Sequence, residues 1–141
     1  MALHGTPAEN GLIQPYFDKL NIPYTSCNAS VSALTFDKYL CNNKLSALGF
    51  NCAQSYIYEK GNKIDIEKII KVVGLPCFVK PNGAGSSNGI SKVKQESDLI
   101  TAINHALEHD TKVLIEQFIN GTEISVGVFF NGKSIKALPI T

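Results

Sequence analysis

The sequence has no tryptophan, one methionine and few cysteines. The four cysteines are Cys27, Cys41, Cys52 and Cys77, and no two of them form a C-x-x-C pair. No histidine stands at a spacing that would complete a zinc site with them. We therefore interpret all four as free and mostly buried thiols, which are typical of cytoplasmic proteins.

The sequence also lacks an excess of either charge. Its 13 lysines and arginines are balanced by 12 aspartates and glutamates, which gives a net charge of +1. This balance argues against a nucleic acid or an anionic membrane as the partner. No apolar run approaches the ~18 residues that cross a bilayer, and the start has neither the basic nor the apolar region of a signal peptide. Because 44% of the residues are hydrophobic and 18% are charged, we expect a folded chain of one domain's size.

Hydrophobic periodicity and turn residues divide the chain into short helices and strands. Two helices are predicted first, one over 13–20 and one from a cap at Thr35 or Asp37 to Gly49. After residue 51 the predicted order is strand, helix, strand, loop, strand, helix and three strands. Their ranges are 52–58, 66–73, 76–81, 82–89, 90–93, 99–107, 112–118, 122–130 and 134–139.

The pair Asn131-Gly132 predicts how the last two strands are joined. Asn-Gly favours a two-residue hairpin turn, and strands joined by such a turn are antiparallel. This excludes a purely parallel, doubly wound sheet. We therefore predict an α+β fold with a mixed or antiparallel sheet and flanking helices.

The glycines cluster in one loop, residues 82–89, which contains Gly83, Gly85 and Gly89. Such a loop exposes backbone N–H groups to an anion, and Lys80 just before it could place a positive charge on a phosphate. The loop is not a P-loop, because no Gly-Lys-Ser/Thr follows, and a strand rather than a helix comes after it. From spacing alone, a phosphate-covering flap and a flexible hairpin tip both remain open.

Charged residues outside this loop are weaker candidates. Glu116 and Glu123 could accept hydrogen bonds from an adenine or a ribose, although each alone is typical of a surface acid. Lys38 lies in the first turn of a helix, where cations are disfavoured, so it indicates either an anionic partner or a surface lysine. His4 and Glu9 lie in an opening turn, where they could contact a substrate or serve a structural role.

Two further histidines have the spacing of metal ligands. His105 and His109 are four residues apart on one predicted helix. No third ligand is evident in the sequence, and residues 108–110 are typical of a solvated helix end. We therefore predict no metal site from the sequence.

Five segments together resemble the D-alanine–D-alanine ligases, and they occur in the same order along the chain. The opening His-Gly…Glu…Gly…Gln at 4–14 is similar to the family's His-Gly-x-x-Gly-Glu-Asp-Gly…Gln signature. The others are Asn-Ile-Pro-Tyr-Thr at 21–25, Thr-Phe-Asp-Lys at 35–38, the Lys80 to Gly89 loop, and Val-Leu-Ile-Glu…Gly-Thr-Glu at 113–123. The resemblance covers the whole chain.

The resemblance implies an ATP-grasp fold and a division of the chain. Residues 1–34 would be the end of an α/β N-terminal substrate domain, and residues 35–141 the central ATP-binding subdomain, truncated on its C-terminal side. Members of the family use ATP to convert the carboxylate of one D-alanine into an acyl phosphate. The amine of a second D-alanine then attacks it and yields the dipeptide used in peptidoglycan synthesis.

The resemblance also implies roles for individual residues. Lys38 and Lys80 would contact the ATP phosphates, and Glu123 the ribose. Glu116 would bind adenine, with backbone groups of Gln117 and Ile119 nearby. The remaining expected site residues are Gly85, Ser86 and Ser87 on the flap over the phosphates, with Ser86 also catalytic and Ser87 also substrate-binding, and His4 and Glu9 beside the D-alanine.

The sequence departs from the family pattern at Ala8, Asn10, Ala84 and Gln117, which alters details of the opening turn and of the ATP contacts. The resemblance places the Mg²⁺ ligands beyond Thr141, so none is expected in this chain. We therefore predict a fragment of a homodimeric cytoplasmic enzyme that is inactive alone. The alternatives are a ligase with D-lactate or D-serine as its second substrate, and a non-catalytic nucleotide-binding module.

Overall fold

The computed structural model describes residues 3–85 and 88–141. Its elements are α1 (Gln14–Lys19), α2 (Ala29–Phe36), α3 (Lys38–Ala47), β1 (Ser55–Glu59), α4 (Ile66–Val73), β2 (Cys77–Pro81), β3 (Ser91–Val93), the 3-10 turn η1 (Glu96–Asp98), α5 (Leu99–Ala106), β4 (Lys112–Gln117), β5 (Val126–Phe130) and β6 (Ile135–Ile140). After residue 51 this is the predicted order of helices and strands. No helix in the described part of the chain has both the length and the apolarity to span a membrane.

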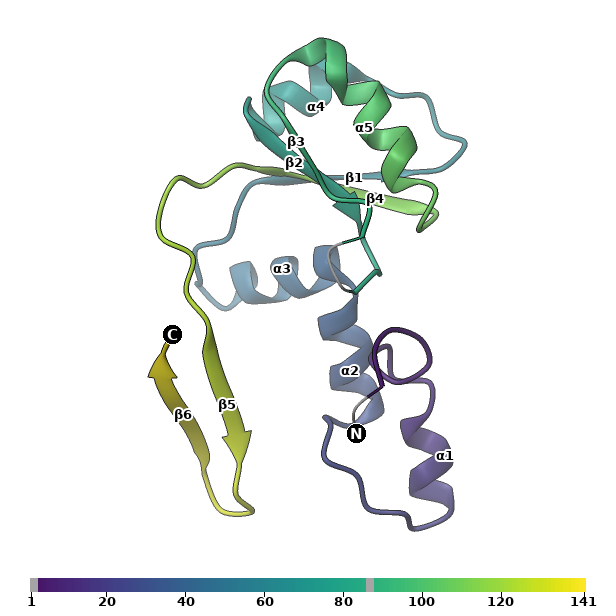
Figure 1. The fold of residues 1–141 in the computed structure, drawn as a ribbon, viewed down its shortest axis with the longest axis vertical. Helices are drawn as coiled ribbons and strands as arrows, with labels where there is room; N and C mark the ends of the chain where they lie inside the picture. Colours follow the sequence, from purple (N-terminus) through teal and green to yellow (C-terminus); the bar gives the residue numbers. More distant parts are fainter. Residues whose placement is uncertain (1–2, 86–87) are drawn as a thin grey trace.

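Four strands form one sheet in the order β1-β4-β2-β3, and β5 pairs with β6 in a second sheet. All the described strand pairs are antiparallel. This confirms the α+β prediction. Figure 1 shows α4 and α5 on one side of the four-stranded sheet and α3 on the other.

The core lies between the sheet and the pair α4 and α5. Side chains alternate between the two faces of a strand, so every second residue of β2 and β4 points into this core. Asp65 caps the start of α4 by accepting a hydrogen bond from the Lys68 N–H, and Gly74 ends the helix with φ of +69°. Fully buried core residues are Ile69, Cys77, Val79, Leu99, Ile103, Ala106, Val113 and Ile115. Burial raises the pKa of the Cys77 thiol.

The helix α2 was not predicted from the sequence. Its segment is rich in serine and β-branched residues, which are weak helix formers. The Asn28 side chain caps its start by accepting from the Val31 N–H at 3.0 Å. Thr35, predicted as a possible cap, lies inside α2, where its hydroxyl donates to the Val31 carbonyl. Asp37 ends α2 and caps α3 by accepting from the Leu40 N–H, which confirms it as the cap that the sequence predicts.

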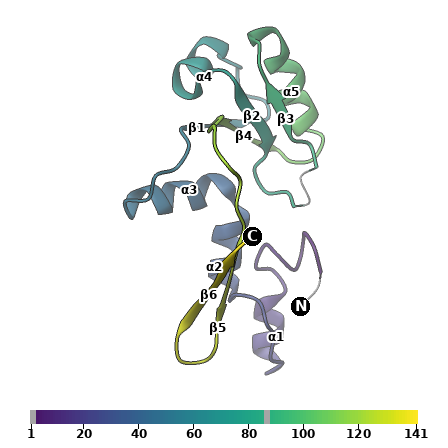
Figure 2. The ribbon, with the colours of Figure 1, turned by 60° about the vertical axis from the view of Figure 1, so that its left-hand side comes forward.

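The hairpin β5–β6 lies away from the four-stranded sheet (Figures 1 and 2). All eleven of its strand residues are exposed, five in β5 and six in β6. The strand predicted from residue 122 begins only at Val126. Ser125 still exchanges two backbone hydrogen bonds with Thr141, and residues 122–124 have no described strand opposite them. At the other end Phe130 lies opposite Ile135, so four residues, 131–134, separate the strands, and the two-residue turn predicted at Asn131-Gly132 is wrong. The Asn131 side chain accepts from the N–H groups of Lys133 and Ser134, which closes this longer turn.

Candidate functional site

The sheet face that turns away from α4 and α5 carries the candidate site. Because residues directly opposite each other on an antiparallel pair share a face, the register places Phe78 with Glu116, and Lys80 with Leu114. Lys80 and Glu116 are therefore diagonal neighbours on this face. The Lys80 ammonium forms an ion pair with Glu116 Oε1, and the two side chains are 20% and 15% exposed. Each member of such a mostly buried ion pair at the edge of a cavity can form a hydrogen bond with a polar ligand instead of with the other.

A cavity of about 530 Å³ opens beside this ion pair. It brings together Lys80, Glu116, Gln117, Ile119 and Glu123, all of which the family resemblance had indicated as ATP-binding. Lys80 comes from β2, and the others come from β4 and the residues that follow it, so the antiparallel register of these strands brings Lys80 beside them.

The same cavity has an apolar wall that sequence reasoning missed. Phe78, Ile90 and Phe118 line it, and the rings of Phe78 and Phe118 are 5.9 Å apart and tilted by 54°. The Lys92 ammonium lies 3.4 Å from the centre of the Phe118 ring. The alternation of β2 could have revealed this wall from the sequence, since Phe78 and Lys80 lie on the face opposite the buried Cys77 and Val79. Apolar rings beside a few polar groups suit a planar heterocycle.

A second cavity of about 370 Å³ extends the site toward α3. Lys80, Glu116 and Ala53 line both this cavity and the first one. Lys38, Cys41 and Cys52 also line it. The predicted cations Lys38 and Lys80 therefore share one cavity, although 42 positions separate them in the sequence (80 − 38).

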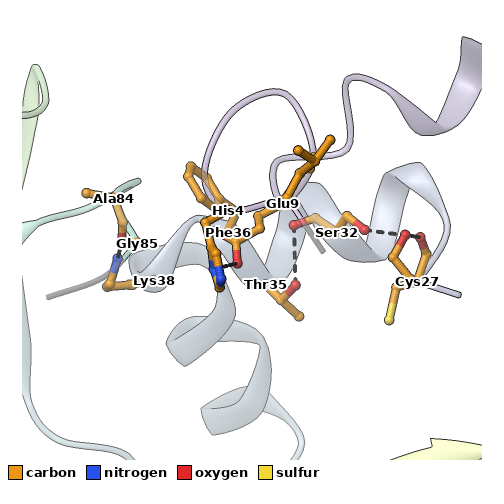
Figure 3. A pocket seen from close by; sticks show the side chains of 12 residues that line it. His4, Glu9, Cys27, Ser32, Thr35, Phe36, Lys38, Ala84 and Gly85 are labelled. Atoms are coloured by element: carbon orange, nitrogen blue, oxygen red, sulfur yellow. Dashed lines mark hydrogen bonds and ion pairs between the residues drawn. The ribbon is translucent and has the colours of Figure 1, made fainter. Parts of the chain in front are cut away.

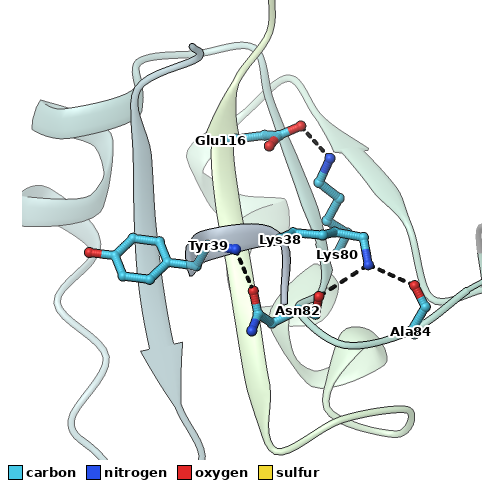
Figure 4. Close-up of polar contacts among 6 residues, drawn as sticks. All are labelled: Lys38, Tyr39, Lys80, Asn82, Ala84 and Glu116. Carbon is cyan, nitrogen blue, oxygen red and sulfur yellow. Dashed lines mark hydrogen bonds and ion pairs between the residues drawn. The ribbon is translucent and has the colours of Figure 1, made fainter. Parts of the chain in front are cut away.

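The first turn of α3 is bound to the start of the glycine loop (Figure 4). The Lys38 ammonium donates to the carbonyls of Asn82 and Ala84 at 3.1 and 2.6 Å. The Asn82 side chain accepts from the Tyr39 N–H at 2.9 Å, which satisfies one of the free donors at the helix start. The Asn82 N–H donates to the Lys112 carbonyl, so the loop is tied to β4 as well. Sequence reasoning missed Asn82.

Lys38 is held where its positive charge is unfavourable. Burial lowers its pKa, and the charge of Lys80 lowers it further, while Asp110, Glu116 and Asp37 act in the opposite direction. Carbonyl oxygens are neutral partners, and among residues 3–85 and 88–141 no carboxylate forms an ion pair with the Lys38 ammonium. An anionic group in this cavity would stabilise both lysines.

A third cavity, of about 510 Å³, joins the glycine loop to the opening turn (Figure 3). His4, Glu9, Lys38 and Gly85 all line it. Glu9 Oε2 accepts from the Gly5 N–H at 2.6 Å, and Glu9 Oε1 lies 3.7 Å from His4 Nδ1. A Cβ added at Gly85 would lie 3.0 Å from Glu9 Oε2, so the flap contacts the opening turn closely. The predicted Ser86 and Ser87 lie outside the described residues.

Gln14 holds the wall of this third cavity in place. The side chain is fully buried, and its Nε2 donates to the Ala8 carbonyl at 2.7 Å and to Ser26 Oγ at 3.2 Å. Gly11 allows the turn before it, since its φ is +83° and a Cβ there would collide with the Ala29 carbonyl. The Gly and the Gln of the opening motif are therefore structural, and they pack the turn against α2.

The described residues do not offer a magnesium site at these cavities. Glu116 is paired with Lys80, and Asp110 accepts from the N–H groups of Gly83 and Lys112. Mg²⁺ favours several oxygen ligands around one centre. Within residues 3–85 and 88–141, the single cluster of three metal-ligating side chains is His105, Glu108 and His109.

Comparison with known proteins places this architecture in a family. Residues 44–141 match the family model described as "D-ala D-ala ligase C-terminus". A D-alanine–D-alanine ligase from Flavobacterium johnsoniae is 51% identical over 140 residues, which are 99% of this chain and 43% of that protein.

Solved structures are similar over nearly the whole chain. A D-alanine–D-alanine ligase from Bacillus anthracis complexed with ATP has a TM-score of 0.84 at 32% identity, covering 99% of this chain and 45% of that one. A D-Ala:D-Ser ligase from Enterococcus faecalis has a TM-score of 0.88 at 34% identity, covering 98% of this chain and 40% of that one. The chain thus spans less than half the length of these proteins.

The antiparallel sheet, its glycine loop and the cavities on its open face define an α+β chain of the ATP-grasp type. More narrowly, the chain belongs to the D-alanine–D-alanine ligase family, a family of ligases. This confirms the resemblance carried by the five sequence motifs.

Asn82→Ala should lower the free energy of unfolding by about 1–3 kcal/mol, because it leaves the Tyr39 N–H without its partner at the start of α3. Urea denaturation followed by circular dichroism measures this. The matched control is Asn88→Ala, an exposed asparagine of the same loop, which should change the stability by less than about 0.5 kcal/mol. Equal stability of the two variants would contradict the structural role of Asn82.

Proposed function

We propose that this chain binds ATP, and that the whole protein is an ATP-dependent ligase that joins two D-alanines for peptidoglycan synthesis. The observation that supports it most is one cavity that combines the charged residues Lys80, Glu116 and Glu123 with the apolar wall described above. Apolar side chains, carboxylates and a lysine are the contacts that suit the heterocycle, the sugar and the phosphate chain of ATP. The similarity to a ligase structure complexed with ATP supports the same assignment.

The adenine would lie at the Glu116 end of the cavity. The Phe78 and Phe118 rings offer it apolar contact, and the Glu116 carboxylate can accept a hydrogen bond from its amino group. Gln117 and Ile119 border the same space and would offer backbone groups to the ring edge. Glu123, on the following loop, would accept hydrogen bonds from the ribose hydroxyls.

The phosphates would lie between Lys38 and Lys80. Both ammonium groups line one cavity, and burial makes each of them a stronger partner for an anion than it would be in water. The backbone of the glycine loop adds N–H donors on the side that Lys38 already contacts. In the proposed reaction a D-alanine carboxylate oxygen attacks the γ-phosphorus and ADP leaves, so charge neutralised by these lysines lowers the barrier.

D-alanine would bind in the cavity of His4 and Glu9. That cavity also borders Lys38 and Gly85, so a substrate carboxylate there would lie between the opening turn and the phosphates. We propose that Ser86 and Ser87 complete the flap, which excludes water from the acyl phosphate. The amine of the second D-alanine then attacks the acyl carbon and releases phosphate.

The family resemblance implies Mg²⁺, which would neutralise phosphate charge when bound. Glu116 is paired with Lys80 and Asp110 with a backbone N–H, and the described residues hold no cluster of three metal ligands in the cavities, so they do not fit that ion and no step is derived through it. We further propose residues 1–34 as part of a substrate domain, residues 35–141 as part of the ATP-binding subdomain, and a cytoplasmic homodimer as the whole protein. The proposed domain boundary falls inside α2.

D-alanyl-D-serine is a second candidate product. The D-Ala:D-Ser ligase from Enterococcus faecalis is as similar in fold as the ATP-complexed D-alanine–D-alanine ligase. The relative at 51% identity favours D-alanine as the acceptor. Steady-state rates of the whole protein with D-alanine and D-serine as competing acceptors distinguish the two.

Lys80→Ala should weaken ATP binding by about tenfold or more, because a hydrogen bond to a charged group contributes ~1.5–3 kcal/mol. Isothermal titration calorimetry or the fluorescence of a labelled ATP analogue measures the dissociation constant. Lys44→Ala removes an exposed lysine of α3 outside these cavities and should bind ATP as the unchanged chain does. ATP affinity that is equal in both variants would count against the proposed phosphate site.

The 141-residue chain by itself should release no phosphate and form no dipeptide from ATP and D-alanine. It spans 43% of its relative from Flavobacterium johnsoniae, and its described residues hold no magnesium site in the cavities. A coupled phosphate-release assay with the whole protein as the positive control measures this. Turnover by the chain alone would show that the missing part is dispensable.

A further inference from the structure

A cluster of three potential metal ligands lies at the end of α5, outside the cavities of the proposed nucleotide site. His105 lies in the last turn of α5, and Glu108 and His109 lie in the turn that follows. One nitrogen of each histidine and one carboxylate oxygen all lie within 4.8 Å of one another. The sequence indicated only the two histidines as possible ligands. The turn after α5 brings Glu108 beside them, and the sequence spacing does not predict this.

Backbone hydrogen bonds hold the three residues in this arrangement. The N–H groups of Glu108, His109 and Asp110 donate to carbonyls of the last turn of α5 at 3.1–3.3 Å. The helix itself is anchored, because Leu99, Ile103 and Ala106 on its inner face are fully buried. The spacing of the ligands is therefore set by an ordered segment.

The side chain of His109 is also restrained by its neighbours. Gly89 has a φ of +73°, and a Cβ there would lie 2.5 Å from His109 Cδ2 and 2.9 Å from Pro81 Cγ. The imidazole ring therefore packs closely against the end of the glycine loop. The rings of His105 and His109 are 5.8 Å apart in an edge-to-face arrangement, and one nitrogen of each ring lies within 4.8 Å of the other.

The surroundings favour a cation at this place. The carbonyl end of a helix carries a partial negative charge. Asp110, the next residue after His109, accepts from the N–H groups of Gly83 and Lys112, so its carboxylate does not compete for the ion. Ser91 Oγ lies 3.5 Å from His105 Nδ1 and can orient that ring.

We propose that His105, Glu108 and His109 form a binding site for a divalent transition metal ion of the zinc type. Zn²⁺ binds imidazole nitrogen and carboxylate oxygen at about 2.0–2.2 Å, which places neighbouring ligands ~3.3 Å apart. Ligand atoms within 4.8 Å need to approach by at most about 1.5 Å, and the exposed side chains of His105 and Glu108 can move toward the more restrained His109. Water completes the coordination. Mg²⁺ is excluded by its preference for oxygen ligands.

Titration of the chain with Zn²⁺ in a calorimeter, and with Co²⁺ by visible absorption, tests the site. One ion per chain should bind, and Mg²⁺ in excess should not displace it. His105→Ala and His109→Ala should each weaken binding by about tenfold or more, and Glu108→Gln by a smaller factor. The variants should fold normally, because all three residues are exposed.

Two control variants separate this site from other metal contacts. His4→Ala removes the third histidine of the chain, and Glu67→Gln removes a carboxylate on α4, so neither should change the affinity for Zn²⁺. The absence of saturable binding would overturn the proposal. It would also be overturned if the double variant His105→Ala/His109→Ala bound Zn²⁺ as tightly as the unchanged chain.

Discussion

The hydrogen bonds that Asn82 accepts, from Lys38 at its carbonyl and from the Tyr39 N–H at its side chain, hold the candidate site together. They join the start of α3, the first residues of the glycine loop and, through the Asn82 N–H, the strand β4. Without them the loop would be a hairpin tip with no fixed relation to Lys38. With them the two lysines line one cavity, and Lys38 lines another together with Ala84 and Gly85 of the loop.

In β2 and β4, alternate side chains serve different purposes: one set packs in the core and the other faces the candidate site. Cys77, Val79, Val113 and Ile115 turn toward α4 and α5, where all are fully buried. Their neighbours turn the opposite way and carry the polar pair Lys80 and Glu116. A slip of one residue in the register would expose the core and bury the charges, so core packing also fixes the geometry of the site.

The elements after residue 51 could be predicted because their caps, periodicity and Asn-Gly turn are local signals. The helix α2 could not, because its weak helix formers are held by the Asn28 cap and by packing against the opening turn. Asn82 was missed for a different reason, since its partner Tyr39 is 43 residues away and no local pattern marks it. Glu116 and Lys80 became a pair only through strand register, although the family resemblance had indicated both.

The central claim is that ATP occupies the cavities between Lys38, Lys80 and Glu116. Cys41 and Cys52 line one of them, Cys27 lies outside both, and Cys77 is buried. The most direct measurement is the rate at which a thiol reagent modifies each cysteine with and without ATP, read by mass spectrometry. The account predicts that ATP slows modification of Cys41 and Cys52 and leaves Cys27 unchanged, while Cys77 stays unmodified in the folded chain. Equal rates at Cys41 and Cys52 with and without saturating ATP would contradict it.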